Sequence, residues 1–235
     1  MLTRRHIRLK IMQIIYALKI SDFEYTKETE KKLLESIDSS YNLYLILISL
    51  LIEILNRAQE KYLISQKKFL SDQNNIYDNK KFIKNQLLNL LKSDHLFNQE
   101  INKRNLNLWD LDFKYIDLIY EKLIKSELFS DYIKSDEISF KNDRDFVAEF
   151  YKKIIATNDK LYSFLEDRNI NWIDDFPLIN TIILKLINKS KETNSKTYFL
   201  PKLYKDNQDK VFAKDLLKTT LKNYNDYNNE ISKKT

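Results

Sequence analysis

The first twenty residues of the chain contain a cluster of side chains that could bind an anion. Arg4, Arg5 and Arg8 lie here, three of the seven arginines in the chain, together with Lys10 and Lys19 and no acidic residue. This segment therefore carries +5 of the formal net charge of +6. Arginine binds phosphate through two parallel hydrogen bonds, which lysine cannot do. The clustered arginines therefore indicate a phosphate-binding segment, whereas the lysines are scattered along the chain.

A helix is expected to position this cluster. An apolar stripe at helical spacing predicts a helix over residues 3–20, with Thr3 as its N-cap. The stripe consists of Ile7, Ile11, Ile14 and Leu18. Arginines in the first turn oppose the helix dipole, at a cost of about 0.3–1 kcal/mol each. An external phosphate would turn that cost into a gain, because the free N–H groups, the dipole and the guanidinium groups would all face it.

The outer side of this helix carries groups that suit unpaired RNA. Its aromatic ring and amide supply stacking and hydrogen bonding, which are the contacts used in single-strand recognition. The candidate RNA-binding residues are Arg4, Arg5, His6, Arg8, Gln13 and Tyr16. Two alternatives stay open. The basic charge could be merely solvated, or Leu9, Tyr16 and Ile20 could form a second stripe that packs on another helix and leaves nothing for RNA.

The opening LTRRHIRLKIMQIIYAL resembles the arginine-rich start of the NusB family of bacterial transcription antitermination factors. Residues 35–54 and the later tryptophan segments are similar to a long bacterial subgroup of that family. The resemblance implies a cytoplasmic, helical protein of two subdomains. It also implies binding of the boxA single strand of nascent ribosomal RNA, together with the ribosomal protein NusE and the transcription elongation complex. The long middle section departs from compact members, and the helices that help bind NusE are expected to be missing.

Composition restricts the fold class. The chain of 235 residues has no Gly and only two Pro, so the tight hairpin turns of sheet proteins are disfavoured. We expect an all-α bundle of about ten helices. The absence of Cys excludes disulfides, cysteine zinc sites and thiol nucleophiles. The most apolar run, residues 41–55, is too short and too interrupted to span a bilayer, which predicts a buried core helix and no membrane partner.

An internal repeat of about 64 residues organises the rest of the chain. Residues 109–124 and 172–187 are identical at eight of sixteen positions, where chance would give about one or two. Each copy is expected to hold three helices, one of them directly after a tryptophan. The predicted divisions are an N-terminal region at 1–70, repeat units at 81–142 and 143–205, and an incomplete third unit at 206–235.

The third unit is expected to lack its closing helix. Its first helix would then expose an apolar face consisting of Phe212, Leu216, Leu217 and Leu221. We therefore expect a C-terminally truncated chain whose last thirty residues are the least stable.

Catalytic patterns are not recognisable, and we expect a protein that is not an enzyme and uses neither cofactor nor metal. The two histidines, His6 and His95, are far apart, and motifs that depend on Gly are excluded. Carboxylate pairs that precede apolar helical patterns are interpreted as N-caps; they are Asp110/Asp112, Asp143/Asp145 and Asp174/Asp175. Structural roles are expected for Trp109, Trp172, Phe113 and Phe176. The alternatives are a helical protein-interaction scaffold and the NusB-like domain of an RNA methyltransferase.

Overall fold

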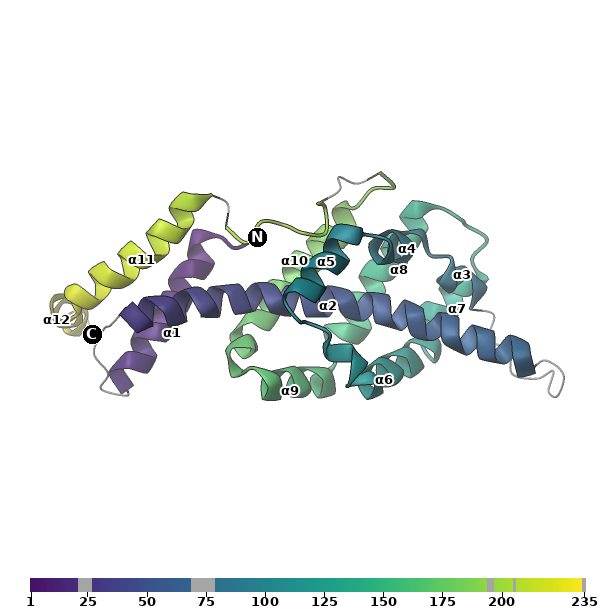
Figure 1. Cartoon of the computed structure of the whole chain (residues 1–235), viewed down its shortest axis with the longest axis horizontal. Coiled ribbons are helices and arrows are strands. Elements are labelled where there is room, and N and C mark those ends of the chain that lie inside the picture. The colour runs from purple at the N-terminus through teal and green to yellow at the C-terminus, as the bar shows by residue number, and fades with distance from the viewer. Residues whose placement is uncertain (21–26, 69–78, 194–196, 205, 234–235) are drawn as a thin grey trace. The chain divides into compact units, whose positions relative to one another are not determined.

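The computed structural model describes residues 1–20, 27–68, 79–193, 197–204 and 206–233. Over these residues it contains twelve α-helices, three short 3-10 or π segments and no strand (Figure 1). The expected all-α multi-helix fold is therefore confirmed. The chain forms two compact units: unit 1 comprises Met1–Tyr41 and Pro201–Thr235, and unit 2 comprises Asn42–Leu200.

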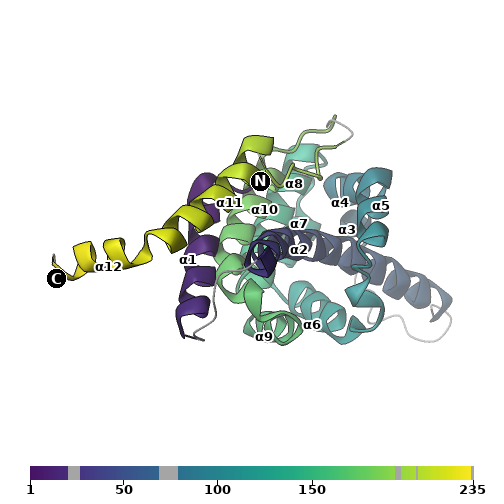
Figure 2. The same cartoon turned by 60° about the vertical axis from the view of Figure 1, so that its left-hand side comes forward.

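Unit 1 is built around two helices from opposite parts of the sequence. It contains α1 (Arg4–Ile20), the first part of α2 (Lys27–Lys68), α11 (Asn207–Lys222) and α12 (Tyr224–Ser232). Helix α11 lies alongside α1 in both views (Figures 1 and 2). The core of the unit is apolar, with Leu2, Ile7, Ile11, Leu33, Ile37, Ala213 and Leu217 all buried.

The expectation of an uncovered apolar face on α11 is wrong. Leu217 is fully buried, and Phe212, Leu216 and Leu221 are half-buried. The cover comes from α1, whose apolar stripe packs against α11. The sequence repeat predicted that only a helix following α11 could cover this apolar face. The helix that covers it is α1, about 200 residues earlier in the chain.

Unit 2 places its helices around the second part of α2 (Figure 2). Its other elements in chain order are α3 (Lys80–Ile83), α4 (Gln86–Lys92), α5 (His95–Lys103), η1 (Leu108–Asp110), α6 (Phe113–Ile124), α7 (Glu127–Lys134), α8 (Phe140–Phe150), the π-helical η2 (Tyr151–Ile155), α9 (Asp159–Arg168), η3 (Ile170–Asp175) and α10 (Phe176–Lys189).

The centre of α2 is buried on all sides. Every residue from position 43 to position 52 is buried, including Tyr44, whose hydroxyl donates to the Phe199 carbonyl at 2.9 Å. In the described part of the chain, α2 is the one helix long and apolar enough to cross a membrane, and 78% of that stretch is buried inside the protein. Burial of this kind is typical of a core helix. A cytoplasmic location stays a prediction.

The two tryptophan segments share one order of elements. A helix (α5 or α9) leads to a short 3-10 turn with a tryptophan, and the next helix begins at Phe113 or Phe176. Both tryptophans are buried, Trp109 at 4% and Trp172 at 6% exposure. The divisions at 1–70, 81–142, 143–205 and 206–235 follow sequence similarity rather than compactness, and they stay predictions.

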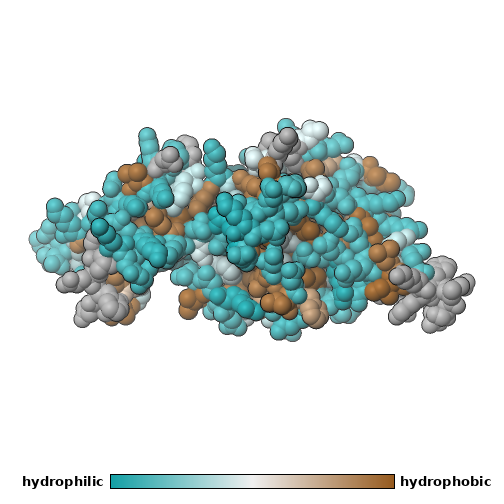
Figure 3. All heavy atoms as spheres, viewed as in Figure 1, coloured by the Kyte–Doolittle hydropathy of each residue, from teal (hydrophilic) through white to brown (hydrophobic). Residues whose placement is uncertain are grey.

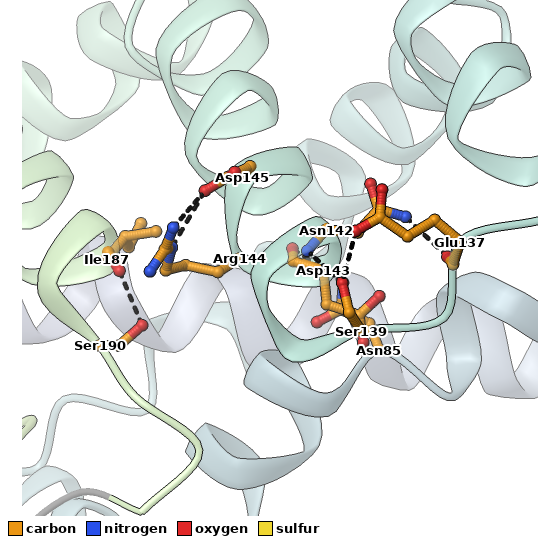
Figure 4. Close-up of polar contacts among 9 residues, drawn as sticks. All are labelled: Asn85, Glu137, Ser139, Asn142, Asp143, Arg144, Asp145, Ile187 and Ser190. Carbon is orange, nitrogen blue, oxygen red and sulfur yellow. Dashed lines mark hydrogen bonds and ion pairs between the residues drawn. The ribbon is translucent and has the colours of Figure 1, made fainter. Parts of the chain in front are cut away.

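Six of the described α-helices begin at a capping side chain, and none of these starts needs Gly. Side-chain oxygens of Asn85, Asp94, Ser126, Ser139, Asn158 and Asp206 accept backbone N–H groups of the following turns. Figure 4 shows one such start: the Ser139 hydroxyl accepts from Asn142 N at 3.1 Å and donates to the Glu137 carboxylate at 2.8 Å. Asn105, at φ 53°, is the one non-Gly residue in the described chain with positive φ, which Asn tolerates well.

Candidate nucleic-acid interface

The start of α1 is fixed by a reciprocal cap. The Thr3 carbonyl accepts from the backbone N–H groups of His6 and Ile7, and the Thr3 N–H donates to Nδ1 of His6 at 3.1 Å. The Thr3 hydroxyl also lies 2.9 Å from this nitrogen. His6 thus satisfies the N-cap N–H in the way that Glu or Gln does in a capping box. This contact gives His6, a candidate RNA-binding residue, a structural role in holding the first turn.

Two of the three clustered arginines are held by α11. The Arg4 Nε donates to the Asp209 carboxylate at 3.0 Å, and this carboxylate is buried while the Arg4 side chain is half exposed. The Arg4 guanidinium carbon lies 4.9 Å from the centre of the Phe212 ring, and that of Arg8 lies 5.4 Å from it. One aromatic ring therefore carries two guanidinium groups at cation–π distance.

Arg5 is the arginine that faces solvent without a structural partner. It lies in the first turn, where α1 has no acidic residue, and no hydrogen bond or ion pair links it to the described part of the chain. Its charge adds to the partial positive charge of the helix N-terminus. An anion that binds here would interact with both the Arg5 guanidinium and the partial charge of the helix N-terminus.

An exposed stripe continues from Arg5 along α1. Tyr16 is 68% exposed, and Leu9, Met12 and Ile20 are exposed at 41%, 59% and 68%. Gln13 is half-buried beside this stripe. Leu9, Tyr16 and Ile20 therefore do not form a stripe packed on another helix, which was one alternative from the sequence. The structure places Arg5 and Tyr16 on the outer side of α1, with Gln13 at its edge and the exposed Arg8 on the flank beside Phe212 of α11.

Sequence reasoning missed the residues of α11 and α12 that surround this helix. Asp209 and Phe212 hold Arg4 and Arg8, and Nζ of Lys19 lies 4.0 Å from the centre of the Tyr224 ring. These partners are about 200 positions away from α1, so no local spacing could have indicated them. Asp209 also acts on the Met1 amino group: burial lowers the pKa of that amine, and the carboxylate opposes this shift.

Three of the four residues expected to have structural roles are in the core of unit 2. Trp109 donates from Nε1 to the Ile46 carbonyl and the Ser49 hydroxyl, at 3.2 and 3.1 Å. Phe176 is 7% exposed and stacks on Tyr162 at 4.4 Å between ring centres. Phe113, which aligns with Phe176, is 63% exposed. Phe113 is therefore not a core residue, unlike Phe176, whose ring is covered by Tyr162. The structural role expected for Phe113 stays a prediction.

The paired carboxylates do not cap their own helices through their side chains. Asp112 and Asp175 are at N-cap positions without a side-chain capping hydrogen bond, and Asp112 instead accepts from Arg168 at 2.8 Å. The interpretation of these pairs as caps is therefore wrong for the side chains. Asp112 therefore forms an ion pair with Arg168 at the end of α9 rather than a helix cap.

Asp143 and Asp145 have different hydrogen-bond partners and lie apart from each other (Figure 4). The buried Asp143 carboxylate accepts from Gln86 N at 2.7 Å and from the Tyr132 hydroxyl at 2.6 Å, while Asp145 accepts from the Arg144 guanidinium. Burial, followed by the hydrogen bond to Asp143, raises the pKa of Tyr132. Over the described residues, no group of three His, Asp or Glu side chains is arranged to hold a metal ion.

Comparison of the chain with protein-family models, curated proteins and solved structures finds no match.

Proposed function

We propose that the chain is a non-enzymatic RNA-binding protein of the transcription antitermination type, which binds a boxA-like single strand through α1. The proposal is carried by the exposed surface of α1, where Arg5 and Arg8 lie near the start of the helix and the exposed ring of Tyr16 lies about two to three turns further along, on a helix that has no acidic residue. Guanidinium groups suit the phosphates of a single strand, and the tyrosine ring suits a stacked base.

The resemblance to NusB supplies the finer part of this proposal. The partners would be the NusE ribosomal protein and the transcription elongation complex. The candidate contacts are Arg4, Arg5, Arg8, Gln13 and Tyr16, and His6 supports them by holding the first turn. Arg5 and Arg8 carry the largest part of the expected RNA affinity, because Arg4 is already paired with Asp209.

The second candidate is a protein-interaction scaffold. The exposure of Leu9, Met12 and Ile20 favours it, because a stripe of apolar side chains on a helix is a common docking surface for proteins.

A mobility shift with a boxA-like single strand and a scrambled one tests the proposal. Wild type should bind the boxA-like strand more tightly. The double variant Arg5→Ala, Arg8→Ala should weaken binding, and each lost phosphate contact should lower the slope of log affinity against log salt by about 0.7. The matched control removes the same charge from exposed positions of α10, Lys185→Ala with Lys189→Ala. Equal affinity and slope for wild type and the arginine variant would favour the scaffold.

A further inference from the structure

Two large apolar side chains lie exposed where α6 of unit 2 begins. Leu111 is 83% exposed and Phe113 is 63% exposed. Figure 3 shows apolar side chains along the edge of unit 2 where α6 and α9 lie. These two side chains are called the Leu111–Phe113 platform below.

The second copy of the repeat shows that the fold does not need this platform. The position that aligns with Leu111 is Asp174, and the one that aligns with Phe113 is Phe176, which is buried under Tyr162. The turn before α10 therefore forms with an acidic residue in place of Leu111 and with a buried phenylalanine in place of the exposed Phe113. An exposed Leu and Phe in the first copy thus have no role that the second copy requires.

A pocket of about 290 Å³ adjoins the platform. Its apolar part consists of Trp109, Phe113 and Ile116, and its polar part consists of Glu53, Asn56, Arg57, Glu60 and Asp110. This volume is at the lower end of small-molecule pockets. It therefore suits a single long side chain.

Negative charge exceeds positive charge in this pocket. Its one cation, Arg57, is occupied by Asp117 at 2.5 and 2.9 Å and by Glu60 at 3.0 Å. Glu53 accepts only from the Asn56 amide, at 3.2 Å, and Asp110 is exposed without an ion pair in the described chain. Burial is the main cause that raises the pKa of Glu53; the Asp110 and Glu60 carboxylates also raise it, while the hydrogen bond from Asn56 and the charge of Lys92 lower it. An incoming cation would relieve this repulsion.

We propose that this surface binds a basic protein segment, which inserts a lysine or arginine side chain into the pocket and lays an apolar side chain on the Leu111–Phe113 platform. The charge of the pocket selects the cation, and the aromatic rings of Trp109 and Phe113 add cation–π attraction. The platform supplies the apolar anchor that protein interfaces place beside such pairs. This interface is independent of RNA binding by α1.

Selection of short random-sequence peptides on the full chain tests this proposal. Selected peptides should share a Lys or Arg next to a large apolar residue. Leu111→Asn, which removes the apolar side chain without adding charge beside the acidic pocket, should weaken their binding about tenfold or more, as expected for loss of one apolar anchor. Asp110→Asn should weaken binding and make it less sensitive to salt. Ile138→Asn is the matched control, because Ile138 is 86% exposed elsewhere in unit 2, and it should leave binding unchanged.

Four results would overturn the proposal. Selected peptides that share no Lys or Arg, or a selection that yields no peptide, would rule out a basic segment as the partner. Equal affinity for wild type and Leu111→Asn would show that the peptides bind elsewhere. Sedimentation that shows a dimer of wild type and a monomer of Leu111→Asn would make the platform an interface between two copies of this chain.

Discussion

The Arg4 guanidinium joins the two ends of unit 1 by donating to the buried Asp209 carboxylate at 3.0 Å. The same guanidinium lies over Phe212, one turn further along α11. Arg4 thus serves the packing of α1 on α11, whereas its sequence neighbour Arg5 has no such partner in the described chain. Adjacent arginines of the same cluster therefore have different roles.

Arg4→Ala should destabilise the protein by about 1 kcal/mol, because the buried Asp209 carboxylate loses a donor while the half-exposed arginine limits the effect. Urea unfolding measures this change. Arg5→Ala is the matched control and should stay within about 0.5 kcal/mol of wild type. Equal destabilisation by the two substitutions would contradict the separate roles of these residues.

Phe212→Leu should weaken RNA binding by about two- to fivefold, because each cation–π contact is worth about 0.5–1 kcal/mol and the arginines would lose their fixed position. Phe212→Tyr keeps the ring and should restore binding. A titration of labelled single-stranded RNA measures both. If Leu and Tyr at this position give the same affinity, the ring does not position Arg4 and Arg8.

Phe176→Ala should cost about 3–5 kcal/mol of stability, as should Trp109→Ala and Trp172→Ala, because each removes a buried aromatic side chain. Phe113→Ala should cost no more than about 0.5 kcal/mol, since Phe113 is mostly exposed. Thermal unfolding of the four variants checks the contrast. A large loss for Phe113→Ala would show that Phe113 is a core residue despite its exposure.

Glu53→Gln should raise stability at pH 7. Burial raises the pKa of Glu53 above its ordinary 4.5, so the ionised form is less favourable in the folded protein than in the unfolded chain. Stability from the neutral form is fully present below pH 4.5 and is lost as the pH rises through the raised pKa. The advantage of the glutamine variant over wild type should therefore shrink on acidification, which denaturant unfolding at several pH values would reveal. A constant advantage would mean that ionisation is not its cause.

The sequence by itself determined the helical class, the buried centre of α2 and the clustering of basic residues on α1. These properties depend on local spacing. A helix repeats every 3.6 residues, so periodicity places Ile7 and Ile11 inside and Arg5 outside without knowledge of any other element. The absence of Gly and the Asn, Asp and Ser caps are equally local.

Only the tertiary structure decided which partner each side chain meets. Phe113 and Phe176 occupy the same position of the repeat, yet one is exposed and the other is buried, where Tyr162 stacks on the Phe176 ring. Asp209 meets Arg4 although about 200 residues separate them in sequence. Burial and pairing depend on which elements pack together over such distances. Packing of this kind is a property of the whole chain, and a short segment with its periodicity does not contain it.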